Sequence, residues 1–301
     1  MKSKTLALAC AALLIAGADL AAAAAAPARA ASGAIVEAVQ MPAWVERNGE
    51  NIPLAPGMAL RDRDHVRTGA HSRLLLRMPE GSAVKLGENA GLALDSLRMQ
   101  RDGHRFAGAM RVVFGAFRFT TDLLAKVGGV RRDLDISVAT VTIGVRGTDI
   151  WGKSTRDRDI VCLIEGRIQV QRGADAEFVM DQPLSYYVAP RRAPALPVAP
   201  VPMEQFREWA AETEIEPGRG ASRRGGRWKV VLATVDTQEE ALRIYDSVRD
   251  AGYAAEILPS KQGDKSIYSL RLAHLPSKAE AQALADSIRG KMGVTEPKVA
   301  Q

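Results

Sequence analysis

The sequence predicts a multidomain protein in which an all-β sandwich or roll is followed by an α+β domain of βαββαβ order. Three observations support this prediction. The 301 residues, 47% of them hydrophobic and 25% charged, are enough for more than one ordinary globular core. Residues 34–188 contain many short β-type runs separated by turn residues. Residues 227–299 contain two similar halves, spaced by about 40 residues.

The first 30 residues have the organisation of a secretory signal peptide. Lys2 and Lys4 precede an apolar run at 6–15, and an alanine-rich stretch then ends in Ala-Arg-Ala at 28–30. We expect cleavage after Ala30 and export to the periplasm. A retained membrane anchor is the alternative, but Gly17 and Asp19 interrupt the apolar stretch that an anchor of about 20 residues requires.

Residues 34–188 are predicted to form the all-β domain. Glycine or acidic residues separate its short runs, as at Pro-Glu-Gly 79–81 and Gly-Glu-Asn 87–89. Such close and regular spacing is typical of a sandwich or roll. The β-type runs lie at residues 73–78, 82–86, 110–114, 116–120, 136–145, 160–165 and 167–171.

Residues 189–226 are predicted to be a linker rich in Pro, Ala, Gly and Arg that contains one short helix. The helix, at 203–212, would place Phe206 and Trp209 on the same side. Residues 218–226 have the composition of an exposed, flexible connector. Their arginines are interpreted as solvated linker charges, with a basic patch as the alternative.

The C-terminal repeat consists of a strand, a capping box and an amphipathic helix. The strand at 228–235 aligns with the strand at 268–275, and both alternate apolar residues on one face. Thr237 with Glu240, and Ser277 with Glu280, form capping boxes. The helices then present matching apolar stripes, so both are expected to cover the same face of a four-stranded sheet and leave the other face open. The stripes are Ala241, Ile244, Tyr245 and Val248, and Ala281, Leu284, Ala285 and Ile288.

These residues resemble a SPOR domain, a ferredoxin-like module that binds peptidoglycan glycan strands lacking stem peptides. The resemblance covers residues 227–299 through Trp228, Val230 and Leu232, and through Tyr268, Leu270, Leu272 and the helix start at 277–281. It implies a glycan-binding site on the open sheet face, formed by Lys229, Val231, Ser269 and above all Arg271. Val231 replaces the glutamine usual in the family, and Ala233 and Ala273 replace glycines. Trp228 and Tyr268 share the parity of the core residues, so packing is favoured over sugar stacking.

Residues 34–188 resemble a FecR-type domain. The matching motifs are Asp-His-Val-Arg-Thr-Gly at 64–69, the Glu-Gly-Ser turn at 80–82, Val-Arg-Gly-Thr-Asp-Ile at 145–150 and Glu-Gly-Arg-Ile-Gln-Val at 165–170. Family members that regulate sigma factors carry a cytoplasmic segment and a transmembrane helix before this domain. Here a signal peptide occupies that place, so transmembrane signalling is not carried over.

Several motifs resemble catalytic or cofactor-binding patterns but lack the context that such chemistry requires. Residues 147–154 match the phosphate-loop pattern, but a charged turn and a strand follow where a helix is needed. The four histidines lack metal-ligand spacing, and the paired carboxylates Asp62/Asp64 and Asp133/Asp135 lie on presumed turns. Cys162 has apolar neighbours and is expected to be buried. An RNA-binding role would require aromatic residues on the open sheet face, which has none. We therefore predict a non-enzyme without metal, cofactor, nucleotide or nucleic acid.

Two functional hypotheses remain. In the first, a periplasmic cell-envelope protein binds peptidoglycan glycan strands through its SPOR-like domain, at remodelled or septal sites linked to cell division, while its FecR-like domain contacts another envelope or outer-membrane protein. In the second, the FecR-like domain acts as a periplasmic sensor or regulatory interaction module and the C-terminal domain is only a scaffold. The net charge of +6 favours anionic partners but selects none.

Overall fold

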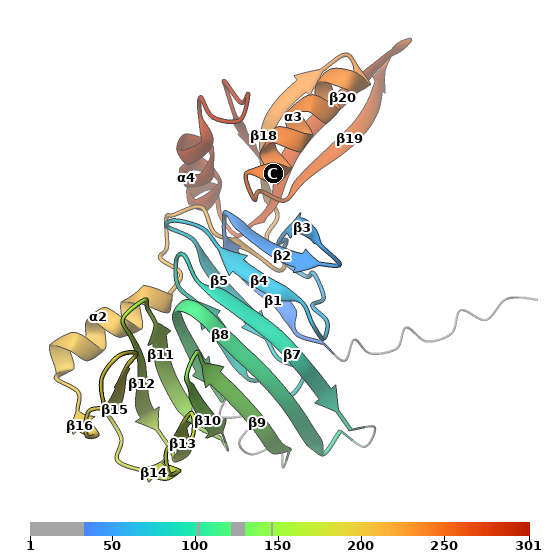
Figure 1. Ribbon diagram of the computed structural model, residues 1–301. Helices are drawn as coiled ribbons and strands as arrows, with labels where there is room; N and C mark the ends of the chain where they lie inside the picture. The colour runs from blue at the N-terminus through green and yellow to red at the C-terminus, as the bar shows by residue number, and fades with distance from the viewer. Residues whose placement is uncertain (1–32, 101–102, 122–129, 146) are drawn as a thin grey trace, which may run out of the picture. The chain divides into compact units, whose positions relative to one another are not determined.

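The computed structural model describes residues 33–100, 103–121, 130–145 and 147–301. The predicted signal peptide and its cleavage site therefore lie outside the described residues, as does Arg146. No helix among the described residues has both the length and the apolar character needed to span a membrane. Figure 1 shows the order of the elements along the chain.

The N-terminal domain contains two antiparallel sheets, which we call sheet A and sheet B. Their pairing order is β17-β1-β5-β6-β8-β11-β12-β15-β16 in sheet A and β3-β2-β4-β7-β8-β9-β10-β13-β14 in sheet B, where β8 and β9 are the parallel pair. The bounds in sheet A are β1 Ile35–Gln40, β5 Arg73–Arg77, β6 Ala83–Leu86, β8 Arg105–Thr120, β11 Asp149–Ser154, β12 Arg158–Glu165, β15 Ser185–Pro190, β16 Ala199–Pro200 and β17 Ser222–Arg223. Those in sheet B are β2 Ala43–Arg47, β3 Glu50–Pro53, β4 His65–Thr68, β7 Gly91–Met99, β9 Arg131–Val138, β10 Val141–Val145, β13 Ile168–Arg172 and β14 Phe178–Met180.

Strand β8 belongs to both sheets and turns a corner between them. Its first part pairs with β7 and β9, and its second part pairs with β6 and β11. The corner is at Gly115, whose φ of +81° suits glycine and whose added Cβ would lie 2.5 Å from Ala90. Inward-facing side chains of both sheets then form one continuous core, which includes Leu74, Leu92, Phe119 and Ile143. The predicted all-β sandwich is confirmed.

A second, smaller apolar cluster covers the outer face of sheet A. Helix α2, Met203–Thr213, lies along this face (Figure 1) and places Phe206 and Trp209 against it. The rings of Trp209 and Trp151 stack with centroids 4.7 Å apart and planes inclined by 4°. Cys162 is fully buried in the same cluster, as predicted, and burial raises the pKa of its thiol to about 12. It is therefore a small apolar core residue in the folded protein.

The C-terminal domain has the predicted βαββαβ order. Its strands pair in the order β19-β20-β18-β21 to form what we call sheet C, and helices α3 and α4 share one buried cluster with that sheet. Thr237 and Ser277 cap the two helices by accepting from the amides of Glu240 and Glu280. The elements are β18 Trp228–Val235, α3 Gln238–Asp250, β19 Ala255–Gln262, β20 Lys265–Leu275, α4 Lys278–Ile288 and β21 Lys298–Ala300.

The segment at 218–223 makes specific contacts that its composition does not predict. Glu280 is 9% exposed, and its carboxylate accepts hydrogen bonds from the amides of Gly218, Gly220 and Ala221 at 2.6, 2.7 and 3.0 Å. Strand β17 then pairs with β1 in sheet A. The side chain of Glu280 thus binds a distant segment and does not complete the reciprocal half of the predicted capping box.

Candidate functional site

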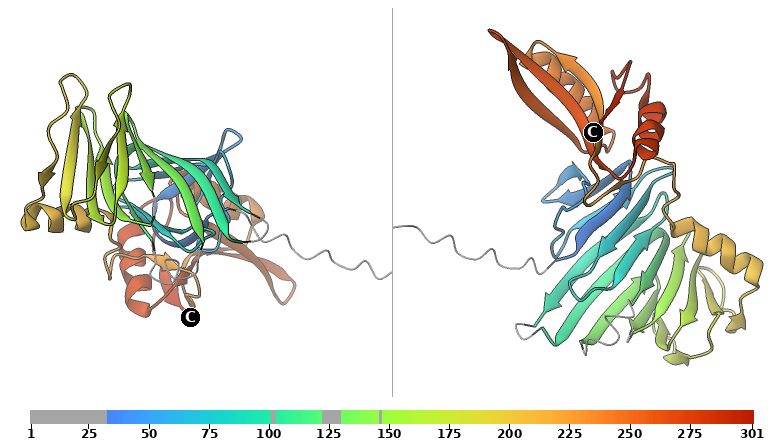
Figure 2. Two further views of the ribbon diagram at one scale, coloured as in Figure 1. Left: turned by 90° about the horizontal axis from the view of Figure 1, so that it is seen from below. Right: turned by 180° about the vertical axis from the view of Figure 1, so that it is seen from behind.

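The open face of sheet C brings the predicted site residues together. Figure 2 (right) views this sheet from the side opposite α3. The strand registers place Glu256, Arg271, Val231 and Lys298 directly opposite one another, in a single row that crosses all four strands. A second row pairs Leu258 with Ser269. Residues opposite each other across a ladder share a face, so these two rows form one surface.

Arg271 lies at the centre of this surface. Its Nε donates to the Glu256 carboxylate at 3.0 Å, and the two side chains are 29% and 43% exposed. This contact fixes the guanidinium plane, which carries four further N–H donors. Lys229, at one end of the face, donates from Nζ to the main-chain oxygen of Gln301 at 2.7 Å. Arg271 is therefore the side chain best placed to donate to a ligand over the middle of the sheet.

Two β-bulges modify the pattern that simple alternation predicts. Between Val231 and Ala233 the register shifts, so Ala233 pairs with the buried Leu270 and packs on the core instead of the open face. The second shift, near His274 with a φ of +66°, brings Trp228 opposite the buried Leu275. Trp228 and Tyr268 both pack against the core cluster, in agreement with their parity.

The surface combines apolar and hydrogen-bonding groups at close range. Val231 and Leu258 present apolar side chains, the latter 36% exposed, while Ser269 and Arg271 supply donors. Sugar rings present apolar faces together with hydroxyl and acetamido groups, so such a mixture suits a glycan strand lying across the sheet. Sequence reasoning missed Glu256 and Lys298, because their place in the row depends on strand register and not on local pattern.

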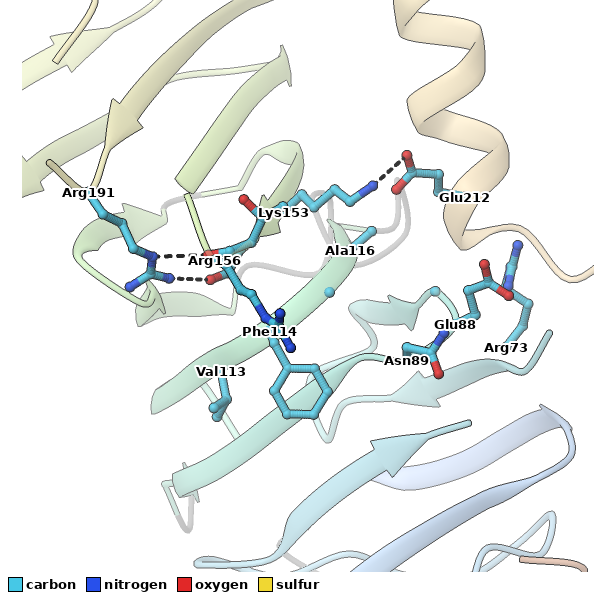
Figure 3. Close-up of a pocket in the computed structure, with 14 residues that line it drawn as sticks. Arg73, Glu88, Asn89, Val113, Phe114, Ala116, Lys153, Arg156, Arg191 and Glu212 are labelled. Atoms are coloured by element: carbon cyan, nitrogen blue, oxygen red, sulfur yellow. Dashed lines mark hydrogen bonds and ion pairs between the residues drawn. The ribbon is translucent and has the colours of Figure 1, made fainter. Parts of the chain in front are cut away.

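A second candidate site is a cavity of about 790 Å³ at the β8 corner of the N-terminal domain (Figure 3). It was not predicted from the sequence. Cationic side chains line much of it, beside the exposed apolar pair Val113 and Phe114. The lining residues are Arg73, Gly87, Glu88, Asn89, Val113, Phe114, Gly115, Ala116, Lys153, Ser154, Thr155, Arg156, Arg191 and Glu212.

The motifs that carry the resemblance to FecR domains have structural roles. Asp64 is 2% exposed and accepts from Arg47 at 2.9 and 2.6 Å and from the amide of Arg61 at 2.7 Å. The hydroxyl of Thr68 donates to the carbonyl of Gly87 at 2.7 Å. Asp149 accepts a bidentate pair of hydrogen bonds from Arg118 at 3.0 and 2.7 Å. These contacts stabilise the fold, and both carboxylates, Asp64 and Asp149, are paired with arginines.

The other chemical candidates are also explained by the fold. Residues 149–154 form strand β11 and a turn leads into β12, so the phosphate-loop pattern at 147–154 lacks its helix. Asp62 accepts from the amide of Leu97 at 2.7 Å, and Asp133 pairs with Arg105 at 3.0 Å. Across the described residues, no group of three or more His, Cys, Asp and Glu side chains is arranged to hold a metal ion.

Glu80, in the Glu-Gly-Ser turn, is an unusual buried carboxyl group. The residue is 6% exposed, and neither carboxylate oxygen has a hydrogen-bond partner. Burial raises its pKa, whereas the nearby Ser82 hydroxyl and the positive charge of Arg132 act in the opposite direction. Folding therefore makes this side chain easier to protonate than an exposed glutamate.

We expect Glu80→Gln to stabilise the protein at pH 7.5 by about 1 kcal/mol, because a neutral amide avoids burying an unpaired charge. A carboxyl whose pKa is raised on folding contributes stability below its unfolded pKa and loses it as pH rises through the folded pKa. The difference in melting temperature between variant and wild type should therefore grow as pH rises from 4 to 8. Glu50→Gln, an exposed carboxylate, is the control. An equal shift at all pH values would contradict the assignment.

Comparisons with known proteins agree with both resemblances. The FecR protein family model matches residues 64–169, and the SPOR domain model matches residues 225–297, in the order expected. FecR and SPOR domains are regulatory and binding domains typical of envelope or periplasmic proteins. A search of curated proteins found no match.

Two solved structures have low sequence identity and low structural similarity to the chain. Both are crystal structures described as "a putative anti-sigma factor from Parabacteroides distasonis", at 2.50 and 1.65 Å resolution. The first is 13% identical with a TM-score of 0.38, and the match covers 74% of this chain and 89% of that one. The second is 13% identical with a TM-score of 0.37, covering 79% and 98% respectively.

Proposed function

Because the chain carries a FecR domain followed by a SPOR domain, we propose that it is a non-catalytic periplasmic protein that binds peptidoglycan glycan strands through the open face of sheet C. The FecR domain then contacts a second envelope component. Export follows from the signal peptide pattern, with cleavage after Ala30. Binding to denuded glycan would direct the protein to remodelled or septal peptidoglycan during cell division.

The observation that carries this proposal is the row of Glu256, Arg271, Val231 and Lys298 across the open face. Arg271 lies between Glu256, which accepts from it, and the apolar Val231, so it can donate to hydroxyl or acetamido oxygens of a glycan strand that crosses the sheet. Val231 stands where family members carry glutamine, which removes one group able to donate and accept. The binding energy therefore depends more heavily on Arg271.

Retention on purified sacculi tests the proposal. The chain comprising residues 31–301 should sediment with sacculi, and more strongly after amidase pretreatment, which removes stem peptides. Arg271→Ala should weaken binding about tenfold, since a hydrogen bond from a charged group contributes about 1.5–3 kcal/mol. Val231→Gln should strengthen it by restoring a two-way hydrogen-bonding side chain.

Arg243→Ala is the matched control, because Arg243 lies on helix α3 with 71% of its side chain exposed. Binding by this variant should equal that of the wild type. Failure of the wild-type chain to bind either sacculus preparation would reject glycan binding. Wild-type affinity in Arg271→Ala would place the contact away from the middle of sheet C.

The cavity at the β8 corner favours a second candidate function, that of a periplasmic sensor or regulatory module whose C-terminal domain is a scaffold. Deletion of residues 227–301 distinguishes the two. If sheet C binds glycan, deletion abolishes localisation to the peptidoglycan. If the C-terminal domain is only a scaffold, localisation and partner binding persist in the deletion variant.

A further inference from the structure

The β8 corner exposes two apolar side chains that strand alternation would separate. Gly91 pairs with Phe114 and Leu92 with Val112, so Val113 is the extra residue of a β-bulge. As a result, both Val113 and Phe114 face solvent, with 51% and 41% of their surface exposed. Bulges redirect side chains and are common next to active sites, and here the bulge exposes two adjacent apolar side chains beside a cavity.

The same cavity has an excess of positive charge. Four cationic side chains line it against two carboxylates, Glu88 and Glu212. Lys153 is paired with Glu212 at 2.9 Å, and Arg191 with the fully buried Asp159 at 3.0 Å. These two cations are thus committed to contacts that hold α2 and the β11–β12 turn in place.

Two cations are not committed in this way. Among the described residues, neither Arg73 nor Arg156 makes an ion pair, and Nε of Arg73 is buried without a hydrogen-bond partner. Arg156 extends from the β11–β12 turn, while Arg73 begins β5. Figure 3 shows Arg156 and Phe114 near the centre of the view and Arg73 at its right edge, where Glu88 is also drawn. The surface therefore offers two separated positive charges around an exposed aromatic ring.

We propose that this cavity, which we call the corner pocket, binds an extended acidic peptide segment of an envelope protein that carries an aromatic side chain. Two separated carboxylates of the segment would meet Arg156 and Arg73, and the aromatic group would pack on Phe114 and Val113. The volume of about 790 Å³ is in the range of sites for several groups together, whereas a single compact anion would engage only one of the two arginines. This inference rests on the proposed function and names the chemistry of its second partner.

Fluorescently labelled peptides test the corner pocket directly. The probe is acetyl-Asp-Asp-Phe-Asp-Asp-amide, with Asp-Asp-Ala-Asp-Asp and Lys-Lys-Phe-Lys-Lys as matched peptides. We expect residues 31–301 to bind the acidic aromatic peptide at least tenfold more tightly than either matched peptide, with weaker binding at higher salt. Arg156→Ala and Phe114→Ala should each reduce the affinity about tenfold.

The control variants are Arg98→Ala on β7 and Val179→Ala on β14, both exposed and outside the pocket lining. They should bind as the wild type does. Equal binding of all three peptides, or unchanged affinity in Arg156→Ala and Phe114→Ala, would overturn the proposal. Competition by inorganic phosphate that abolishes the difference between the acidic peptides would indicate a simple anion site and would also overturn it.

Crosslinking to envelope extracts separates the failure of this inference from failure of the proposed function. Suppose that the wild type and the Arg156→Ala/Phe114→Ala double variant crosslink equally to the same partner of the FecR domain. That result would support the proposed function and contradict the proposal that the corner pocket binds the partner. If the acidic aromatic peptide binds as expected but no envelope protein crosslinks to the FecR domain, peptide binding by the corner pocket is supported. The proposed contact between the FecR domain and an envelope protein is then contradicted.

Discussion

Replacing Glu280 by alanine is expected to destabilise the C-terminal domain by about 3 kcal/mol and to release the segment at 218–221. The nearly buried carboxylate accepts three main-chain hydrogen bonds, from Gly218, Gly220 and Ala221. Charge-assisted bonds of this kind contribute about 1.5–3 kcal/mol each, and their sum is reduced because the three share one acceptor group. Their loss would leave buried N–H donors without partners.

Packing around this clamp explains why the segment cannot simply rearrange. Gly220 has a φ of +81°, and an added Cβ would lie 2.9 Å from the backbone of Leu284 on α4. The chain therefore passes over the helix at a distance that only glycine permits. The carboxylate of Glu280 is the acceptor for all three amides, so its removal takes away their partner.

Hydrogen exchange of the peptide spanning 214–224 is the most direct measurement. Protection at Gly218, Gly220 and Ala221 should fall in Glu280→Ala and be partly kept in Glu280→Gln, whose amide retains one acceptor oxygen. Glu240→Ala is the matched control, since Glu240 occupies the same position of the first repeat but is exposed. Unchanged exchange at 218–221 in Glu280→Ala would refute the clamp.

The C-terminal fold could be predicted because its signals are local and repeated. Alternating strands, hydroxyl caps and apolar stripes each lie within a few residues, and each favours the same structure. Glu280 shows the limit of local reasoning. The sequence Ser-Lys-Ala-Glu predicts a capping box, and Ser277 does cap the helix, but the glutamate binds residues 59 to 62 positions away. A long-range partner of this kind leaves no periodic trace.

The candidate sites also combine features that local sequence predicts with features that depend on long-range contacts. Parity alone placed Lys229, Val231, Ser269 and Arg271 on one face, because strand alternation determines facing. The places of Glu256 and Lys298 in the row depend on the register of β19 against β20 and of β21 against β18, which the local pattern does not give. The corner pocket was missed since its exposed Phe114 results from a bulge, and because its arginines belong to elements far apart in the chain. In the sequence, the available signal was the apolar pair Val113 and Phe114 just before Gly115.

Replacing Trp209 by alanine is expected to open the outer face of sheet A, at a cost of about 3–5 kcal/mol. Trp209 stacks on Trp151 with centroids 4.7 Å apart and meets Tyr186 edge-on at 5.5 Å. Trp151 is only 1% exposed, so the helix is the cover that keeps this large side chain from water. Stacked aromatic pairs add to the free energy of burial.

Cys162 reports this opening, because it lies in the same cluster and is the single cysteine after residue 30. In the wild type, burial raises the pKa of its thiol to about 12, so a disulfide reagent should react very slowly at pH 8. Uncovering the cluster returns the thiol to water, lowers its pKa toward the ordinary value and should speed labelling at least tenfold. Trp209→Phe should keep most of the protection.

Met203→Ala provides the matched control, since Met203 begins the same helix with half of its surface exposed. This variant should change the free energy of unfolding by less than about 0.5 kcal/mol. The labelling rate of Cys162 should stay the same. Equal labelling of Cys162 in wild type and Trp209→Ala would mean that the thiol is protected by the sheet alone. In that case α2 would contribute little to the outer cluster. The ion pair between Lys153 and Glu212, which joins the corner pocket to α2, would then not be needed to hold Lys153 in position.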